Sequence, residues 1–170
     1  VRLVAHHDAY LDRLKEWGMH EAVPYGRGIV MLFSGASGTG KTLTARAVAH
    51  HLGRRLLRVD TTRLSDQQGR FQANLDNLLR EARLQNAVLF FDECEALFAA
   101  SNRGTGHLSA LLAALEQFDG VTVLATNMPQ VLDSALDRRI LYRVDFEIPA
   151  PTARQAIWQL HLPPAMPLAD

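Results

Sequence analysis

Apolar residues follow strand-like patterns at five places from position 29 onward. Largely apolar runs of strand length occupy 29–34 (IVMLFS), 87–92 (AVLFFD) and 121–126 (VTVLAT), and a shorter run occupies 56–60 (LLRVD). Such runs are typical of strands buried on both faces of a parallel sheet. Residues 143–148 (RVDFEI) instead alternate polar and apolar side chains. This alternation predicts a strand with one less covered face, at a sheet edge.

The segments between these runs carry apolar residues at helical spacing. The spacing predicts helices over 41–52, 71–85 and 107–118, and a short helix over 133–141. Gly53, directly after the first of these, is a typical C-terminal cap. Strands separated by helix-length connections indicate βαβ units. We therefore expect an α/β fold of three layers (α/β/α), built on a five-stranded, mainly parallel sheet.

Composition narrows the function classes. The 170 residues are 48% apolar and 21% charged, and their formal net charge is zero. This balance is that of a globular domain and argues against a nucleic-acid or membrane partner. The single cysteine, Cys94, has no partner for an internal disulfide and is expected to be a buried residue rather than a nucleophile. With no targeting segment and no apolar run of about 20 residues, we expect a cytoplasmic protein.

The segment SGASGTGKT at 34–42 supplies the first candidate chemistry. From Gly35 to Thr42 it fits the pattern G-x-x-x-x-G-K-[ST], with an apolar run before it and a helical pattern after it. Backbone amides can surround phosphate oxygens where glycines leave room, and the following helix directs its positive end at the anion. Lys41 would contact the β- and γ-phosphates, and Thr42 would offer its hydroxyl to Mg²⁺. The alternative is a flexible glycine-rich turn with a helix cap, but one of only two lysines in the chain falls at the required position.

The candidate phosphate-binding residues are nine consecutive positions: Gly35, Ala36, Ser37, Gly38, Thr39, Gly40, Lys41, Thr42 and Leu43.

Two carboxylates follow the apolar run at 87–92. Asp92 is placed to hold Mg²⁺ through its water shell, together with Thr42. Glu93, one residue further, can orient or deprotonate a water that attacks the γ-phosphoryl group. This favours hydrolysis over phosphoryl transfer to a small acceptor. The alternative is a pair of acids at a helix N-terminus, where the helix dipole stabilises negative charge.

The phosphate loop, FFDECEALF (90–98), LATN (124–127) and LDSALDRRI (132–140) together resemble the AAA+ ATPases, in the order and approximate spacing of that family. The resemblance is greatest to bacterial AAA-type ATPases and implies ATP and Mg²⁺ as cofactors. It implies that Asn127 is the sensor residue that helps to place the attacking water. It also implies that Arg138 and Arg139 are arginine fingers, with Arg143 as another candidate. The catalytic set is then Lys41, Glu93, Asn127, Arg138 and Arg139.

The resemblance also implies a homo-oligomer, a hexameric ring, that couples hydrolysis to the remodelling of an unidentified protein substrate. Residues 1–27 would be an N-terminal helical segment, 28–150 the ATPase core, and 151–170 the start of a truncated helical lid. Residues 65–70 (SDQQGR) carry no aromatic side chain where polypeptide-threading members have one, so we do not expect that mode of threading. A nucleotide-gated switch with little hydrolysis and a DNA-associated loader are the alternative functions.

Overall fold

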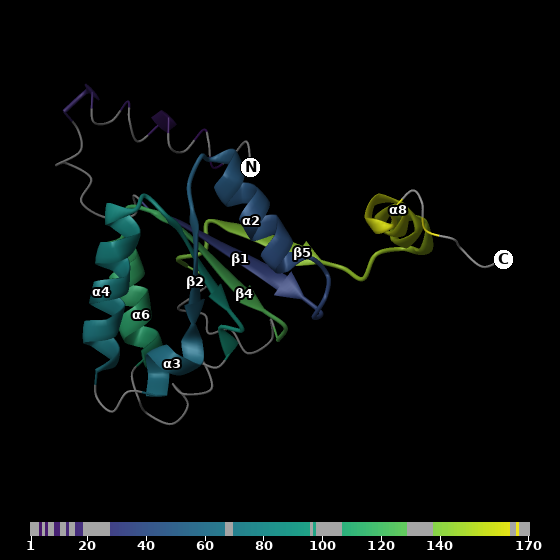
Figure 1. Ribbon diagram of the computed structural model, residues 1–170. Coiled ribbons are helices and arrows are strands. Elements are labelled where there is room, and N and C mark those ends of the chain that lie inside the picture. Colours follow the sequence, from purple (N-terminus) through teal and green to yellow (C-terminus); the bar gives the residue numbers. More distant parts are fainter. Residues whose placement is uncertain are drawn as a thin grey trace.

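The structure is a computed structural model that describes residues 4, 6, 9, 10, 13, 16–18, 28–66, 70–95, 97, 107–128, 138–163 and 166. Strands and helices alternate along most of this length (Figure 1). In chain order the elements are β1 (Ile29–Gly35), α2 (Lys41–His51), β2 (Leu56–Asp60), α3 (Thr61–Asp66), α4 (Phe71–Leu84), β3 (Val88–Asp92), α6 (His107–Glu116), β4 (Val121–Thr126), β5 (Tyr142–Phe146) and α8 (Pro151–His161).

The five strands form one parallel sheet in the order β2-β3-β4-β1-β5. Strand β1, which comes first in the chain, therefore lies between β4 and β5. Parallel register aligns the ends of neighbouring strands: Ser34 of β1 faces Thr126 of β4, and Asp60 of β2 faces Asp92 of β3. As a result, the loops that follow four of the strands emerge at one edge of the sheet.

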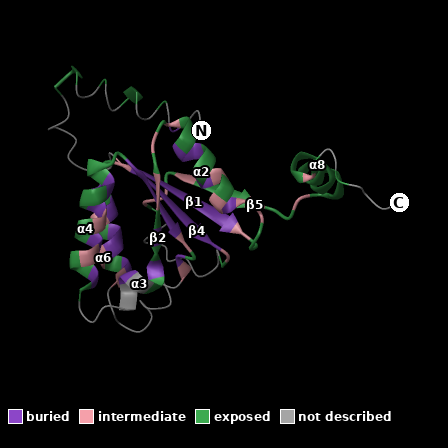
Figure 2. Ribbon diagram, in the orientation of Figure 1, coloured by how far each residue is buried: buried purple, intermediate pink, exposed green. Residues whose placement is uncertain are grey.

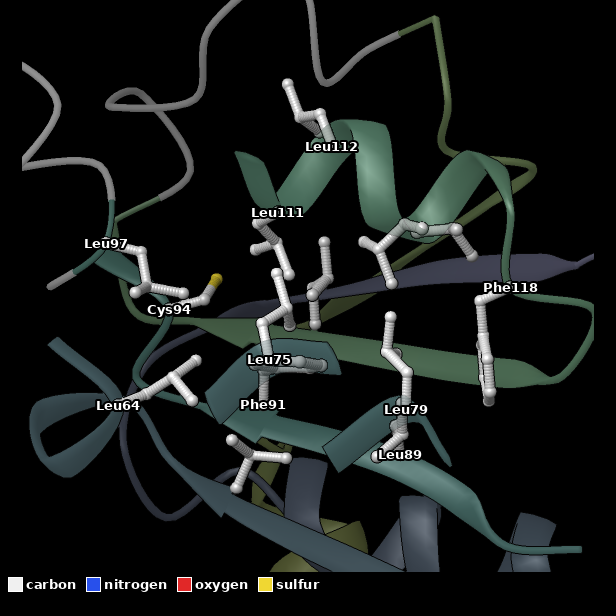
Figure 3. Packing of buried hydrophobic residues seen from close by; sticks show 14 of the residues in the cluster. Leu64, Leu75, Leu79, Leu89, Phe91, Cys94, Leu97, Leu111, Leu112 and Phe118 are labelled. Atoms are coloured by element: carbon white, nitrogen blue, oxygen red, sulfur yellow. The ribbon is translucent and has the colours of Figure 1, made fainter. Parts of the chain in front are cut away.

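The strands are apolar because both faces of the sheet are covered (Figures 1 and 2). On one face, side chains of β3 pack with α4 and α6 in a cluster that includes Leu75, Leu79, Leu111 and Phe91 (Figure 3). On the other face, Ala45, Val48 and Ala49 of α2 cover the alternate strand side chains. This gives the predicted three-layer α/β/α arrangement. No helix in the part of the chain that the structure describes combines the length and the apolar character that crossing a bilayer requires.

The predicted elements agree with the structure to within one or two residues, with two exceptions. The short helix expected over 133–141 does not extend over its described part, because Arg138 and Arg139 form a turn; residues 133–137 lie outside the described residues. Helix α3 was not predicted, and it is only six residues long. A single helical turn and a half is too short to show a clear period.

The outer strand β5 and helix α8 are less covered than the rest (Figure 2). Alternation in the sequence predicted an edge strand, and β5 is one. Helix α8 stands away from the sheet, and none of its residues is buried (Figure 1). Trp158 on this helix is 62% exposed. Of the predicted segments, 151–170 is described as far as residue 163 and at 166, and only scattered positions of 1–27 are described.

Candidate functional site

The candidate site lies at the carboxyl-terminal ends of the strands. Strand β1 leads into the glycine-rich loop 36–40, β3 ends at Asp92, and Asn127 follows β4. Parallel α/β sheets bind ligands at this edge because the loops after the strands converge there. The fold thus brings three of the sequence motifs, the phosphate loop, the acidic turn and Asn127, to one place.

Glycines shape the loop for two different reasons. At Gly35, whose φ is 144°, an added Cβ would come within 2.1 Å of the carbonyl oxygen of Phe146 in the neighbouring strand. At Gly38 and Gly40, φ is 81° and 101°, in the left-handed region that favours glycine. A Cβ at either position would meet no atom within 4 Å. The first glycine therefore permits close strand packing, and the other two permit the left-handed turns of the loop, where the Cβ positions are open.

Lys41, the first residue of α2, is buried with only 8% of its surface exposed. Its Nζ donates to the carbonyl oxygens of Gly35 at 2.7 Å and Ala36 at 2.8 Å, and to Oδ1 of Asn127 at 2.7 Å. An ammonium group has three N–H donors, and here each has an acceptor. All three acceptors are neutral. None of these three contacts is with a carboxylate, so they do not neutralise the buried positive charge of Lys41. This charge strongly attracts an anion to the loop.

Asn127 links this lysine to the turn that follows β3. While its Oδ1 accepts from Lys41, its Nδ2 donates to Oε1 of Glu95 at 3.4 Å. A carboxylate accepts and an ammonium donates, so these two neighbours fix which way the amide of Asn127 points. The other carboxylate oxygen, Oε2 of Glu95, is buried and has no hydrogen-bond partner among the described residues. The structure therefore brings Asn127 to Lys41 and places Glu95 on its other side.

The turn after β3 is anchored by Cys94. Glu93 has a φ of 52°, a left-handed conformation that costs a residue with a side chain about 1 kcal/mol. The amide of Cys94 donates to the carbonyl of Ala125 at 2.9 Å, and its side chain lies in the core beside Leu97 (Figure 3). Burial first, and then the charge of Glu95, raise the pKa of the Cys94 thiol well above its ordinary value. Cys94 is thus a buried neutral thiol, as the sequence predicted.

An open cleft adjoins this turn, between the ends of β2 and β3. Its volume is about 490 Å³. Most of the residues around it are charged or carry a hydroxyl: Arg58, Val59, Asp60, Thr61, Thr62, Asp92 and Glu93. A guanidinium nitrogen of Arg58 lies 2.9 Å from Oδ2 of Asp92. The side chain of Arg58 is 66% exposed and that of Asp92 is 19% exposed.

These residues fit a magnesium nucleotide. Mg²⁺ prefers oxygen ligands and in nucleotide sites keeps several waters, with one or two protein oxygens and the phosphates completing its shell. Asp92 and the hydroxyl of Thr42 are oxygen ligands of this kind. No group of three or more His, Cys, Asp or Glu side chains in the described residues could hold a metal by itself. The arrangement suits an ion that arrives with a phosphate chain.

The remaining predicted site residues take different positions. Leu43, the last residue of the predicted phosphate-binding set, is exposed on α2. Arg139 forms an ion pair with Glu116 at the end of α6. Arg138 beside it is exposed, and so is Arg143 in β5. The two predicted arginine fingers therefore differ, since one is held by its own chain and the other faces outward.

Arg58 and Glu95 were not among the residues predicted to form the site. Glu95 had a local signal, because it lies two residues after Glu93 in the same acidic turn. Arg58 had none, since it reads as one polar residue in a short strand. Its contact with Asp92 depends on the pairing of β2 with β3, which the pattern of apolar residues does not determine.

Comparison with known proteins agrees with this geometry. The sequence profile of the family described as "ATPase family associated with various cellular activities (AAA)" matches residues 31–151. The chain is 33% identical over 156 residues to a 26S proteasome regulatory subunit 8 homolog of Schizosaccharomyces pombe, covering 82% of this chain and 38% of that protein. It is 36% identical over 148 residues to the ATP-dependent zinc metalloprotease FtsH of Methylibium petroleiphilum, covering 77% and 24%.

Solved structures give the same result. The AAA domain of FIGL-1 in complex with ADP has a TM-score of 0.63 and 29% identity, covering 77% of this chain and 47% of that one. A structure described as "Structural Basis for Katanin Self-Assembly" has a TM-score of 0.65 and 30% identity, covering 83% of this chain and 48% of that one. The chain spans less than half the length of each of these four proteins. With its profile match over more than half of the sequence and its five-stranded parallel α/β core, the chain belongs to the AAA family of ATPases.

Proposed function

We propose that this chain binds ATP with Mg²⁺ and hydrolyses it. The observation that carries the proposal is the environment of Lys41, a buried ammonium at the start of a helix, beside a glycine loop with open space over it. Its hydrogen bonds to two loop carbonyls hold it where phosphates would lie. Anions bind at such helix starts because the amides and the helix dipole both favour negative charge. The AAA domain of FIGL-1, similar in fold, was solved with ADP.

Lys41 would exchange partners when a nucleotide binds. Charge-assisted hydrogen bonds to phosphate oxygens are stronger than those to neutral carbonyls. The lysine would therefore release one or more of its acceptors, including the amide of Asn127, and contact the β- and γ-phosphates. Asp92 and Thr42 would hold the metal. Bound Mg²⁺ would neutralise charge on the β- and γ-phosphate oxygens.

Hydrolysis needs an oriented water at the γ-phosphoryl group. We assign its activation to Glu93, which lines the cleft next to Asp92 and is exposed to solvent. The carboxylate would accept a proton from the water as the new P–O bond forms and the bond to the β-phosphate oxygen breaks, giving ADP and inorganic phosphate. Asn127, once released by Lys41, would place this water through its amide. The hydrogen bond from its Nδ2 to Glu95 would remain and would continue to orient the amide.

We further propose that the active form is a homo-oligomer, a hexameric ring, in which an arginine of one subunit reaches the nucleotide of the next. The ion pair between Arg139 and Glu116 within the chain favours Arg138 for this role, because Arg138 is exposed. Guanidinium suits the task since it is always charged and can contact two phosphate oxygens. The energy released would drive remodelling of a protein partner.

Substitution Glu93→Gln tests the assignment of hydrolysis. It removes the proton acceptor and keeps the size of the side chain, so turnover should fall about a hundredfold or more while ATP affinity stays within about threefold. Release of phosphate and binding of a fluorescent ATP analogue measure the two quantities. Unchanged turnover in this variant would remove Glu93 from the mechanism.

The dependence of the rate on protein concentration tests the shared site. A specific activity that rises steeply with concentration, and falls in Arg138→Ala but not in Arg143→Ala, is expected if Arg138 completes the site of a neighbour. Tight ATP binding with no turnover at any concentration would instead indicate a nucleotide-gated switch.

A further inference from the structure

The ion pair between Arg58 and Asp92 lies at the residue to which we assign the metal. Arg58 is directly opposite Phe90 in the register of β2 and β3, two positions before Asp92. Side chains two positions apart along a strand lie on the same face of a sheet. The long side chain of Arg58 therefore reaches along its own face to Asp92, where a guanidinium nitrogen lies 2.9 Å from Oδ2.

We propose that Arg58 is an exchangeable counter-ion of Asp92, which Mg²⁺ must displace, and that it thereby sets the magnesium concentration at which this chain binds ATP. The inference rests on the proposed function, since it presupposes that Asp92 faces the metal of a bound nucleotide. It concerns a residue of strand β2 that lies outside the phosphate loop and outside the acidic turn.

Electrostatics make the two cations competitors. The guanidinium is always charged, so Asp92 holds a positive partner at every physiological pH. A divalent ion that shares this carboxylate lies only a few ångströms from that charge and is repelled by it. Each cation therefore lowers the affinity of Asp92 for the other, as thermodynamic linkage requires.

The two partners differ in exposure. Arg58 is easily displaced, whereas Asp92 requires another cation when Arg58 leaves. Arg58 is 66% exposed, so its guanidinium can return to water at little cost. Asp92 is only 19% exposed, and a carboxylate at this depth depends on a cationic partner. Asp60 and Glu93 line the same cleft and offer the displaced guanidinium other carboxylates. Arg58 is thus suited to stabilise Asp92 and then to leave it.

The test is the magnesium dependence of ATP binding in Arg58→Gln. We expect the magnesium concentration for half-maximal binding of a fluorescent ATP analogue to fall about fivefold, because the competing charge is gone. Binding measured in EDTA should change by less than twofold. Arg58→Lys keeps the charge and should stay within about twofold of the wild type.

Arg55→Gln is the matched control. Arg55 is an exposed arginine just before β2, at the opposite end of the strand from the cleft, so its removal changes the net charge of the chain equally. A shift in magnesium dependence as large in Arg55→Gln as in Arg58→Gln would overturn the inference. So would an equal loss of ATP affinity with magnesium and with EDTA in Arg58→Gln, since that would make Arg58 a phosphate ligand.

The wild type separates this inference from the proposed function. Absence of ATP binding by the wild type at any magnesium concentration would overturn both. Binding by the wild type with no change in Arg58→Gln would overturn the role of Arg58 alone. The melting temperature without ligand shows whether each variant is folded. If Arg58→Gln does not fold, Arg58→Met offers a second neutral side chain with the same expected shift.

Discussion

The two halves of the candidate site are built on opposite principles. One half, which we call the lysine half, consists of Lys41, the loop 35–40 and Asn127. The charge of Lys41 is buried, and the hydrogen bonds of its ammonium group go to neutral acceptors. The other, the acidic half, consists of Arg58, Asp92 and Glu93. It opens into a cleft, and its charges face one another.

This difference separates what is preformed from what must rearrange. In the lysine half, strand β1, helix α2 and strand β4 hold the ammonium in place, so a phosphate chain meets a fixed positive charge. In the acidic half, the partners are more exposed and their ion pair can open at little cost. We therefore expect substitutions of Lys41 and of the loop 35–40 to act on binding, and those in the acidic half to act on the metal and the chemical step.

The largest effect should come from the centre of the lysine half. Lys41→Met removes the buried charge and keeps most of the length of the side chain. ATP affinity should fall about a hundredfold, equivalent to about 2.7 kcal/mol, because charge-assisted hydrogen bonds to the phosphates are lost. Titration with a fluorescent ATP analogue measures the loss. Arg46→Met, which removes an exposed cation from the same helix, should change affinity by less than about twofold.

Asn127 tests whether the lysine half also serves the chemical step. In Asn127→Ala we expect kcat to fall about tenfold to a hundredfold, because a group that places the water is missing. The KM for ATP should change by less than about threefold, since Lys41 keeps its two carbonyl acceptors. Steady-state kinetics separates the two. A rise in KM with unchanged kcat would instead make Asn127 a binding residue, like Lys41.

Glu95 connects the halves, since it belongs to the acidic turn and contacts Asn127. Glu95→Ala removes the carboxylate that accepts from the amide of Asn127, and one hydrogen bond of 3.4 Å is lost. We expect kcat to fall about threefold to fivefold with little change in KM. Glu81→Ala on α4, where the carboxylate accepts from Gln85, is the control for loss of a glutamate. Equal kinetics in the two variants would mean that Glu95 does not position Asn127.

The smallest effect should come from the thiol of Cys94 beneath the acidic turn, and it concerns stability and alkylation rather than turnover. Because burial raises the pKa of Cys94, the folded chain keeps the thiol protonated where an unfolded chain ionises it, above about pH 8.5. The contribution of Cys94 to the free energy of unfolding is thus full below that pH and decreases above it. Iodoacetamide at pH 9 should modify this single cysteine only as the chain unfolds. Rapid alkylation of the folded protein would show that the turn is not anchored in the core.

Most of the fold was predictable because its signals are local. The apolar runs that form β1, β3 and β4 are recognisable by length and content, and alternation correctly placed β5 at an edge. The strand order could not be predicted in this way. Every strand in the middle of a parallel sheet is apolar on both faces, so periodicity does not say that β1 lies between β4 and β5. The turn at 138–139 was missed for a related reason, since a few apolar residues near helical spacing are weak support for a short helix.

The features of the site likewise divide into those that local sequence predicts and those that it does not. Lys41 and the loop before it were recognisable from a pattern of consecutive residues, whereas the contact of Lys41 with Asn127 was not predicted. The contact of Arg58 with Asp92 is non-local and depends on strand pairing. The orientation of Asn127 depends on Glu95, which lies 32 residues away in the chain. Contacts between side chains from different motifs therefore needed the structure.

The close approach at Gly35 has a mechanical consequence. Gly35 is both the last residue of β1 and the first of the phosphate-binding pattern, and it faces Phe146 of the outermost strand. Since even a Cβ would not fit between them, the two main chains touch directly. A displacement of β5 is therefore passed from backbone to backbone into the loop that would surround the phosphates. No side chain lies between them whose change of rotamer could absorb the movement.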